Sequence, residues 1–285
     1  MRIWASAFLG LIQGLCEFLP VSSSGHLLLS RLLLGIQTDT PAMKMLDILL
    51  HVGTLIPVLV VFRREWVDMI LHPIRNKTLL MLFVASLPTL GIYILAKKLF
   101  SSVDGFAVFD NGWFLGASFL MTAVFLLFCD LRGRSPSCRK TKPTWGAAIL
   151  MGLFQGVGMI PGISRSGSTI TGGVLAGMRK DAAARFSFMM SAPAILGSLL
   201  MEGKDALEEG YLLEIELIPT LIGILVACLA GFLAIRFMLR IISKVPMSWF
   251  ALYLAIIGIT YLFLQLKGSS MLPAFALPAA SLAQP

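Results

Sequence analysis

Charged residues are scarce in this sequence, and their scarcity excludes an ordinary soluble domain. Asp, Glu, Lys and Arg make up only 13% of the 285 residues, whereas a soluble domain contains about 25%. Hydrophobic residues reach 57%, and the mean hydropathy is +0.87. These values predict an integral membrane protein.

Cysteine is scarce as well, and its pattern excludes a framework of disulfides. The four cysteines have no paired spacing, so they predict neither disulfides nor a zinc site. They are Cys16, Cys129, Cys138 and Cys228.

Long apolar windows, by contrast, are abundant. A helix that crosses a bilayer needs about 17 to 25 mainly apolar residues. Six such windows occur, at 46–62, 78–96, 113–130, 184–201, 217–235 and 246–266. We expect an all-α, single polytopic membrane domain over 1–266, with repeat halves at about 1–130 and 145–266, followed by a flexible tail over 267–285.

Lys and Arg gather in four segments between these windows. The segments 63–77, 131–142, 179–185 and 236–244 hold 4, 5, 3 and 3 basic residues, which is 15 of the 23 in the chain. Cytoplasmic loops carry such an excess of positive side chains. The loop 202–216 has six acidic residues and one lysine, which suits the outer side. The net charge of +8 is therefore a topology signal, and we expect no nucleic-acid partner.

Two short polar segments interrupt the apolar sequence, and they are copies of each other. They are Gln13–His26 and Pro161–Thr169. Aligned without a gap, Gly10–His26 and Gly152–Ser168 are identical at seven of 17 positions. Such an internal repeat predicts one site that both halves of the chain build.

The loop assignment predicts how these two segments enter the membrane. Because 131–142 and 179–185 face the cytoplasm, the chain between them must enter and leave on that side. Counting the membrane crossings back from the span 46–62 in the same way places 4–34 on the outer side. We therefore expect two re-entrant helix pairs, 4–34 and 145–178, in an inverted-topology repeat whose broken helices meet near the midplane.

Gln13 and Glu17 are four residues apart, so they share one face of a helix. A carboxylate at membrane depth is costly and indicates a functional site. Glu17, helped by the amide oxygen of Gln13, would hold a hard divalent cation such as Mg²⁺ or Ca²⁺. The alternative is that Glu17 pairs with Arg165 and only joins the two helix pairs.

Arg165 stands in a run of hydroxyl residues where an apolar helix restarts. A guanidinium, hydroxyls and the free N–H groups of a helix N-terminus together form an anion site. We therefore expect a phosphate site, although hydroxyls in membrane helices often bond only to the preceding turn. The residues are Ser164, Arg165, Ser166, Ser168 and Thr169.

A possible reactive group lies in the first polar segment, where three serines, Ser22, Ser23 and Ser24, precede His26. A hydroxyl near an imidazole is the smallest set of groups that can perform nucleophilic or base-assisted attack. His51 falls in a predicted span and His72 in a predicted loop, and we assign neither a role.

Both polar segments resemble the signature motifs of the undecaprenyl-diphosphate phosphatase family of the bacitracin-resistance type. The matching stretches are Gln13-Gly-Leu-Cys-Glu17, Pro20-Val-Ser-Ser-Ser-Gly-His26 and Pro161-Gly-Ile-Ser-Arg-Ser-Gly-Ser-Thr169. The resemblance covers the chain to about residue 266. It implies a multi-pass enzyme of the bacterial inner membrane that removes the terminal phosphate of a long polyprenyl diphosphate, with the help of a divalent cation. It also implies a site that opens toward the outer side.

The resemblance also implies roles for single residues. The metal- or diphosphate-binding carboxylate falls on Glu17, the nucleophile on Ser23 and the base on His26. Substrate-binding residues fall on Ser22, Ser164, Arg165, Ser166 and Thr169, with Arg165 also catalytic. Gln13 stands where many members have Glu, which puts a two-carboxylate metal site in doubt.

A different class of protein remains open. Inverted repeats with broken helices are also a transporter architecture, so the chain could instead be a lipid-phosphate flippase or an ion-coupled transporter. The Ser-Ser-Ser-Gly-His run favours the phosphatase, because a binding site needs no histidine beside a serine nucleophile. The sequence leaves a homo-oligomer open.

Overall fold

The computed structural model describes residues 2–36, 38, 40–100, 112–208 and 216–267. Within these ranges the regular elements are helices, with one isolated β-bridge between Lys140 and Met178. The predicted tail, apart from Lys267, and residues 209–215 of the predicted acidic loop lie outside the described residues, while 202–208 of that loop belong to the last turns of α9. The helices are α1 (Ile3–Phe18), α2 (Ser23–Leu34), α3 (Pro41–Val61), α4 (Arg63–Leu71), α5 (Thr78–Phe100), α6 (Leu115–Gly133), α7 (Trp145–Val157), α8 (Arg165–Leu175), α9 (Lys180–Glu208), α10 (Leu217–Ile241) and α11 (Ser248–Leu266).

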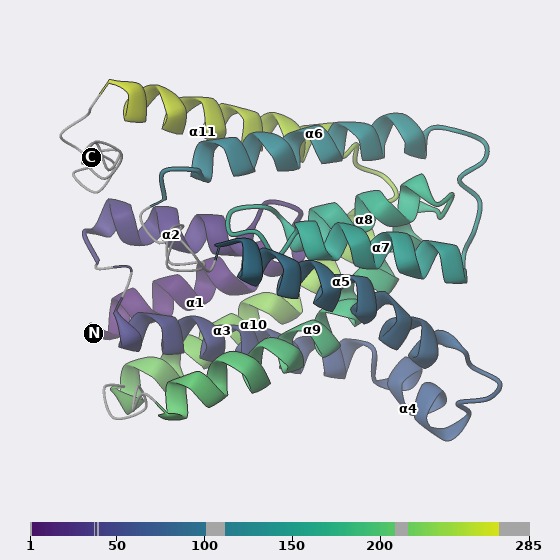
Figure 1. Cartoon of the computed structure of the whole chain (residues 1–285), viewed down its shortest axis with the longest axis horizontal. Helices are drawn as coiled ribbons and strands as arrows, with labels where there is room; N and C mark the ends of the chain where they lie inside the picture. Colours follow the sequence, from purple (N-terminus) through teal and green to yellow (C-terminus); the bar gives the residue numbers. More distant parts are fainter. Residues whose placement is uncertain (1, 37, 39, 101–111, 209–215, 268–285) are drawn as a thin grey trace.

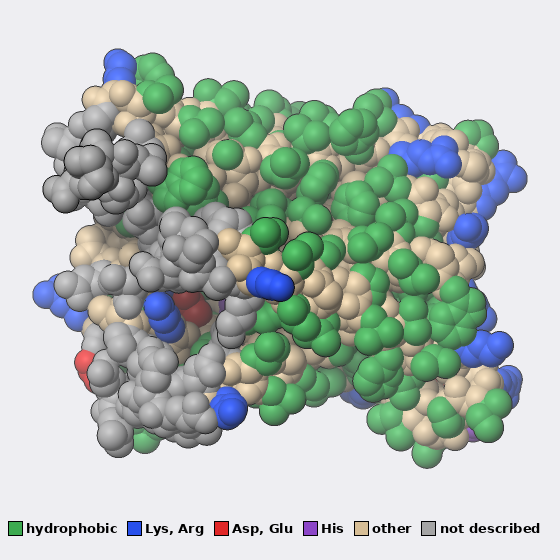
Figure 2. All heavy atoms as spheres, viewed as in Figure 1, with side chains coloured by type: hydrophobic (Ala, Val, Ile, Leu, Met, Phe, Trp, Pro, Cys, Tyr) green, Lys and Arg blue, Asp and Glu red, His purple; other side chains and the backbone are tan. Residues whose placement is uncertain are grey.

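The six predicted membrane spans are confirmed as helices long and apolar enough to cross a bilayer. They are Ala42–Val61, Thr78–Ala96, Leu115–Gly133, Lys180–Met201, Leu217–Ile241 and Ser248–Leu266. Large apolar side chains point outward at helical spacing, as on α10 with Leu221, Leu225 and Leu229. Figure 2 shows that hydrophobic side chains cover much of the visible surface between the two ends, and that many Lys and Arg side chains gather at the right-hand end. The chain is a multi-pass membrane protein.

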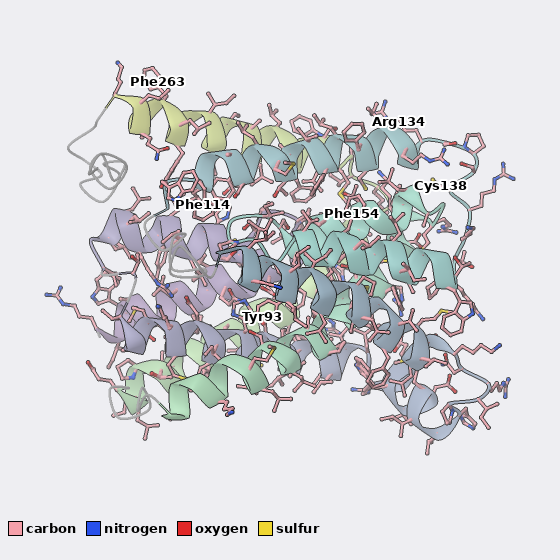
Figure 3. The ribbon with its side chains drawn as sticks, in the orientation of Figure 1. Tyr93, Phe114, Arg134, Cys138, Phe154 and Phe263 are labelled. Carbon is pink, nitrogen blue, oxygen red and sulfur yellow. The ribbon has the colours of Figure 1, made fainter. Side chains whose placement is uncertain are left out.

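The spans run back and forth along one axis (Figure 1). Phe114 before α6 and Phe263 near the end of α11 lie toward the same end, and Arg134 after α6 lies at the other (Figure 3). Helices α6 and α11 therefore run antiparallel, and they pack together along their lengths.

One predicted loop differs from the structure. The segment 63–77 begins with the helix α4, which we did not predict. Met69 on this helix is fully buried, and Trp66 packs against the same core from one turn earlier. An ion pair from Arg185 of α9 to Glu65 also holds α4. The count of Lys and Arg that assigned this segment to a loop carries no information on secondary structure, so it misses a short helix that packs through Trp66 and Met69.

Two pairs of short helices accompany the spans, one before the first span and one between the third and the fourth. Helices α1 and α2 have 16 and 12 residues, and α7 and α8 have 13 and 11, all fewer than the roughly 20 needed to cross a bilayer. In Figure 1 the first pair occupies the left half of the molecule and the second pair the right half. Their entry from opposite membrane faces, and the inverted repeat that this would form, stay predictions.

The two pairs pack in corresponding ways. Helix α1 of the first half packs on α10 of the second half, while α7 of the second half packs on α5 of the first. A Cβ atom at Gly10 would lie 2.3 Å from the carbonyl oxygen of Gly223, and one at Gly152 would lie 2.1 Å from that of Ala85. Only glycine permits these backbone approaches, and the two positions are aligned in the internal repeat.

Candidate active site

The N-termini of two helices meet where the polar segments come together. Ser22 caps α2 by accepting a hydrogen bond from the backbone N–H of Gly25 at 3.1 Å. Ser164 caps α8 in the same way, with the N–H of Gly167 at 3.0 Å. Serine is a favoured cap because its oxygen satisfies a first-turn N–H group. The next residues, Ser23 and Arg165, are thus the first of their helices, where the helix dipole favours a bound anion.

Reciprocal hydrogen bonds join the two polar segments. The backbone N–H of Gly162 donates to Ser24 Oγ at 3.2 Å, and Ser166 Oγ donates to the carbonyl oxygen of Leu19 at 3.1 Å. Ser24 and Ser166 are aligned in the repeat. The polar segments of the two halves of the chain are therefore in contact, as the internal repeat predicted, while their role as one functional site stays a prediction.

Glu17 lies at the centre of this place, with a side chain that is only 3% exposed. Its Oε2 accepts hydrogen bonds from Ser23 Oγ at 2.7 Å and from Gln13 Nε2 at 3.0 Å. Its Oε1 forms an ion pair with the Arg165 guanidinium. The structure therefore brings together four predicted site residues from three helices, and it shows the Glu17–Arg165 pair that the sequence left as an alternative.

The backbone before Ser23 is strained. Ser22 has a φ of +72°, the one positive value among the non-glycine residues that the structure describes. A side chain held there costs about 1–3 kcal/mol. The turn points Ser23 at Glu17, so we interpret the strain as the cost of placing this hydroxyl.

The ring nitrogens of His26 have hydrogen-bond partners other than Ser23, although the sequence predicted the two residues as a nucleophile and its base. Its Nδ1 lies 2.8 Å from the carbonyl oxygen of Ser22, and its Nε2 lies 2.8 Å from the hydroxyl of Tyr253 on α11. Because a carbonyl only accepts, Nδ1 carries the proton and the Tyr253 hydroxyl donates to Nε2. The hydroxyl of Ser23 is bound to Glu17 instead. Helical spacing alone would place Ser23 and His26 on one face, but the Ser22 carbonyl and Tyr253 hold the imidazole and Glu17 holds the Ser23 hydroxyl.

We therefore expect His26 to support the strained turn rather than to take a proton. His26→Asn retains an N–H near the position of Nδ1, so it should keep kcat within about tenfold of wild type, while His26→Ala should lose more. A general base would behave otherwise, because both variants would then lose about 10²- to 10⁴-fold. Phosphate-release rates of the two purified variants decide between these roles.

The predicted phosphate-binding hydroxyls are near Arg165, but they make bonds within the protein. Thr169 Oγ1 donates to the carbonyl of Arg165 at 2.9 Å and lies 2.5 Å from Ser187 Oγ. Ser168 Oγ donates to the carbonyl of Ser164 at 2.7 Å. Phosphate binding by Ser164, Ser166 and Thr169 stays a prediction, and in this structure the hydroxyls fix the start of α8.

The predicted metal ligands fit a cation only in part. Gln13 turns its amide nitrogen toward Glu17, and its Oε1 is buried without a hydrogen-bond partner. In the described part of the chain, no group of three or more His, Cys, Asp or Glu side chains could hold a metal. Since Mg²⁺ commonly binds one or two carboxylates plus substrate phosphates and waters, Glu17 remains compatible with a cation that the substrate helps to hold.

Two residues near the site were missed by the sequence analysis. His51 of α3 has its Nε2 3.7 Å from Glu17 Oε2, and Tyr253 of α11 binds His26. A histidine inside a membrane span is itself a sign of function, and this signal could have found His51. Tyrosine is common in membrane helices, so nothing in the sequence distinguishes Tyr253.

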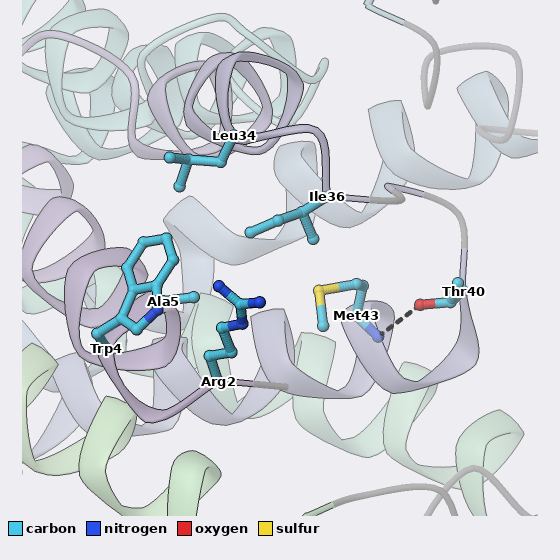
Figure 4. Close-up of a pocket in the computed structure, with 7 residues that line it drawn as sticks. All are labelled: Arg2, Trp4, Ala5, Leu34, Ile36, Thr40 and Met43. Carbon is cyan, nitrogen blue, oxygen red and sulfur yellow. Dashed lines mark hydrogen bonds between the residues drawn. The ribbon is translucent and has the colours of Figure 1, made fainter.

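A surface cavity of about 550 Å³ lies away from these residues. It is bounded by the start of α1, the end of α2 and the start of α3 (Figure 4). Its lining residues are Arg2, Trp4, Ala5, Leu34, Ile36, Thr40 and Met43. None of the residues that contact Glu17 lines this cavity.

The fold and the site define a multi-pass membrane protein that places a carboxylate-bound serine and an arginine at two helix N-termini. The profile of the family described as bacitracin resistance protein BacA matches residues 6–260. The chain belongs to this family.

Its curated relatives cover nearly the whole chain. The undecaprenyl-diphosphatase of Carboxydothermus hydrogenoformans is 39% identical over 271 residues, which are 94% of this chain and 99% of the relative. That of Halothermothrix orenii is 41% identical over 265 residues, 93% of this chain and 98% of the relative. That of Alkaliphilus metalliredigens is 37% identical over 275 residues, 90% and 97% of the two chains.

Proposed function

We propose that this protein hydrolyses undecaprenyl diphosphate to undecaprenyl phosphate and inorganic phosphate, and so recycles the lipid carrier for cell-wall synthesis. The observation that carries the proposal is the hydrogen bond from Ser23 Oγ to Glu17 Oε2 at 2.7 Å, beside the Arg165 guanidinium. It joins a hydroxyl, a proton acceptor and an anion-binding group in one buried place. The names of the relatives agree with this reaction.

The reaction begins with Ser23. Its Oγ attacks the terminal phosphorus while its proton passes to Glu17 Oε2, the acceptor that it already contacts. The bond between that phosphorus and the bridging oxygen breaks, and the polyprenyl phosphate leaves with the bridging oxygen. Water then attacks the phosphoserine and releases inorganic phosphate, which restores the Ser23 hydroxyl.

Arg165 binds the phosphoryl oxygens during this transfer. Its planar fork can bridge two of them, and the N-termini of α2 and α8 add partial positive charge. When the diphosphate is absent, Glu17 is the partner of Arg165. Substrate binding exchanges this ion pair for a contact between guanidinium and phosphate, and it frees Glu17 to act on Ser23.

A divalent cation completes the charge balance. A diphosphate brings about two to three negative charges near neutral pH, while Glu17 and Arg165 cancel each other. Bound at Glu17, Mg²⁺ or Ca²⁺ would polarise the phosphoryl group. Removing divalent ions with a chelator should therefore abolish turnover.

The protein acts, in this proposal, in the bacterial inner membrane with its site open toward the outer side. The isoprenyl chain lies in lipid against the apolar faces of the spans, and only the head group enters the polar site. The Lys- and Arg-rich loops support the orientation of the spans, because such loops stay in the cytoplasm, and the opening toward the outer side follows from the family resemblance alone. A homo-oligomer remains a proposal.

Phosphate release from the purified protein in detergent tests this function against the transporter alternative. Detergent micelles have no second leaflet, so a flippase or ion-coupled transporter would give no signal. We expect inorganic phosphate with wild-type protein and a divalent cation. Movement of the lipid across a reconstituted bilayer, without phosphate release under any condition, would contradict the proposal.

Replacing Arg165 by Lys tests the phosphate contact. Lys keeps the charge but lacks the planar fork, so Arg165→Lys should remain folded and lose at least about tenfold in kcat/KM, as expected for one charge-assisted hydrogen bond of about 1.5–3 kcal/mol. Arg134→Lys is the matched control, because Arg134 is 70% exposed and lies at the far end of α6. Full activity of Arg165→Lys would mean that the arginine serves only as the counter-ion of Glu17.

A further inference from the structure

Tyr253 reaches the site from α11, a helix that lies outside both polar segments and packs on α6. Its hydroxyl lies 2.8 Å from His26 Nε2. The phenol and the imidazole stack, with ring centroids 5.7 Å apart and planes at 9°, and Phe119 of α6 lies against the imidazole at 5.3 Å. Two aromatic side chains from neighbouring spans therefore hold the imidazole, which belongs to a buried residue.

The contact with Tyr253 decides which ring nitrogen of His26 carries the proton. A neutral imidazole has one donor nitrogen and one acceptor nitrogen. Because the Tyr253 hydroxyl donates to Nε2, Nδ1 carries the proton and donates to the carbonyl oxygen of Ser22 at 2.8 Å. With the proton on Nε2 instead, Nδ1 and this carbonyl would be two acceptors facing each other, and the ring would have to move.

The Ser22 carbonyl oxygen accepts a second hydrogen bond, from the backbone N–H of His26 at 3.1 Å. Both of its lone pairs are then used. Ser22 is also the residue with the φ of +72°, and strained backbone persists only where the surrounding contacts fix it. The peptide group held in this way links Ser22 to Ser23, so the two hydrogen bonds also fix the direction in which Ser23 leaves the turn.

We propose that Tyr253 is a positioning residue for the reaction. Its hydroxyl holds His26 in the form that donates to the Ser22 carbonyl. The turn supported in this way keeps Ser23 Oγ against Glu17 Oε2, while Tyr253 itself touches none of the reacting atoms. The effect on rate rests on the proposed function, but the place of the proton on His26 can be measured without turnover.

Removing the hydroxyl with Tyr253→Phe should lower kcat by about two- to tenfold, as expected for the loss of one neutral hydrogen bond. It should leave KM nearly unchanged, because the phosphate contact of Arg165 lies on another helix. Tyr261→Phe is the matched control. Tyr261 is on the same helix, and its hydroxyl donates to the carbonyl of Gly112 at 2.8 Å, so this variant should lose a comparable hydrogen bond without changing turnover per folded molecule.

A second background separates positioning from a contact that only stabilises packing. His26→Asn has no tautomers, since its N–H groups stay on one atom. Tyr253→Phe should therefore cost almost nothing further in kcat when it is combined with His26→Asn. A hydroxyl that only held α11 in place would cost the same in both backgrounds, and this result would overturn the inference.

The proton on His26 is observed directly by nitrogen NMR of the purified protein in detergent, with isotopically labelled histidine and no substrate. The His26 signals are identified by their absence from His26→Asn. Wild-type protein should show a proton on Nδ1 and an unprotonated, hydrogen-bonded Nε2, and Tyr253→Phe should shift the Nε2 signal. A proton on Nε2 of wild type, or an Nε2 signal that Tyr253→Phe leaves unchanged, would overturn the inference.

The two kinds of measurement also keep the inference apart from the proposed function. The predicted NMR spectra together with full turnover by Tyr253→Phe would mean that the contact exists but does not position Ser23, and the inference would fail. The predicted spectra from wild-type protein that releases no phosphate would contradict the proposed function and still support the placement of His26 by Tyr253.

Discussion

Replacing Glu17 by Ala should abolish phosphatase activity, and replacing it by Gln should do nearly the same. The Glu17 carboxylate accepts a hydrogen bond from the Ser23 hydroxyl and pairs with Arg165, so it is the group placed to take the proton of Ser23. The loss of a general base costs about 10²- to 10⁴-fold in rate, and the loss of a ligand of the proposed cation would add to it. The measurement is kcat of the purified variants at saturating Mg²⁺ and Ca²⁺.

Stability must be measured beside activity, because Glu17→Ala leaves the Arg165 charge without its partner in a largely buried place. Glu17→Gln is the better variant, since it keeps the volume and can still accept a hydrogen bond. Asp130→Asn is the matched control. Asp130 is also a buried carboxylate, it binds Lys180 and the N–H of Met247 at the far end of the molecule, and its loss should lower stability without changing turnover per folded molecule. Normal turnover by Glu17→Gln would exclude Glu17 from the reaction.

Replacing Ser23 by Ala should remove almost all activity, because the proposed reaction passes through a phosphoserine. No neighbouring hydroxyl replaces it, since Ser22 caps α2 and Ser24 is bound by the backbone of the second polar segment. Ser30→Ala, two turns further along the same helix, should turn over normally. Rates and stability of both variants in the same detergent provide the measurement.

Residual activity of Ser23→Ala distinguishes two mechanisms. A rate within about tenfold of wild type would mean that water attacks phosphorus directly and that Ser23 only positions it. A rate lower by about 10²-fold or more, together with a phosphorylated serine trapped in wild-type protein by rapid acid quench, would support the covalent step.

Most of the architecture could be predicted from the sequence because membrane helices follow simple physical rules. Length and hydropathy place the six spans, since a backbone in lipid must satisfy its own hydrogen bonds. The aligned polar segments likewise predict the meeting of Glu17, Ser23 and Arg165. Helix α4 could not be predicted from the same rules, because it is short and its stability comes from packing Trp66 and Met69 against the spans.

The hydrogen-bond partners of each polar residue were harder to predict than the presence of that residue in the site. Closeness in sequence suggested that His26 serves Ser23, but the cap at Ser22 turns the imidazole toward a backbone carbonyl and toward Tyr253. The neighbours that decide these contacts are distant in sequence, as Tyr253 is from His26 and His51 is from Glu17. Such contacts depend on how α3 and α11 pack, which hydrophobic periodicity does not specify.

The central claim is that Ser23, Glu17 and Arg165, where the two short helix pairs meet, remove the terminal phosphate of the lipid. The most direct measurement gives purified wild-type protein and Ser23→Ala the same undecaprenyl diphosphate in detergent and quantifies both products. We predict equal amounts of inorganic phosphate and undecaprenyl phosphate from wild type, and almost none from the folded variant. Folded wild-type protein that releases no phosphate, or a variant that releases it at the wild-type rate, would contradict the account.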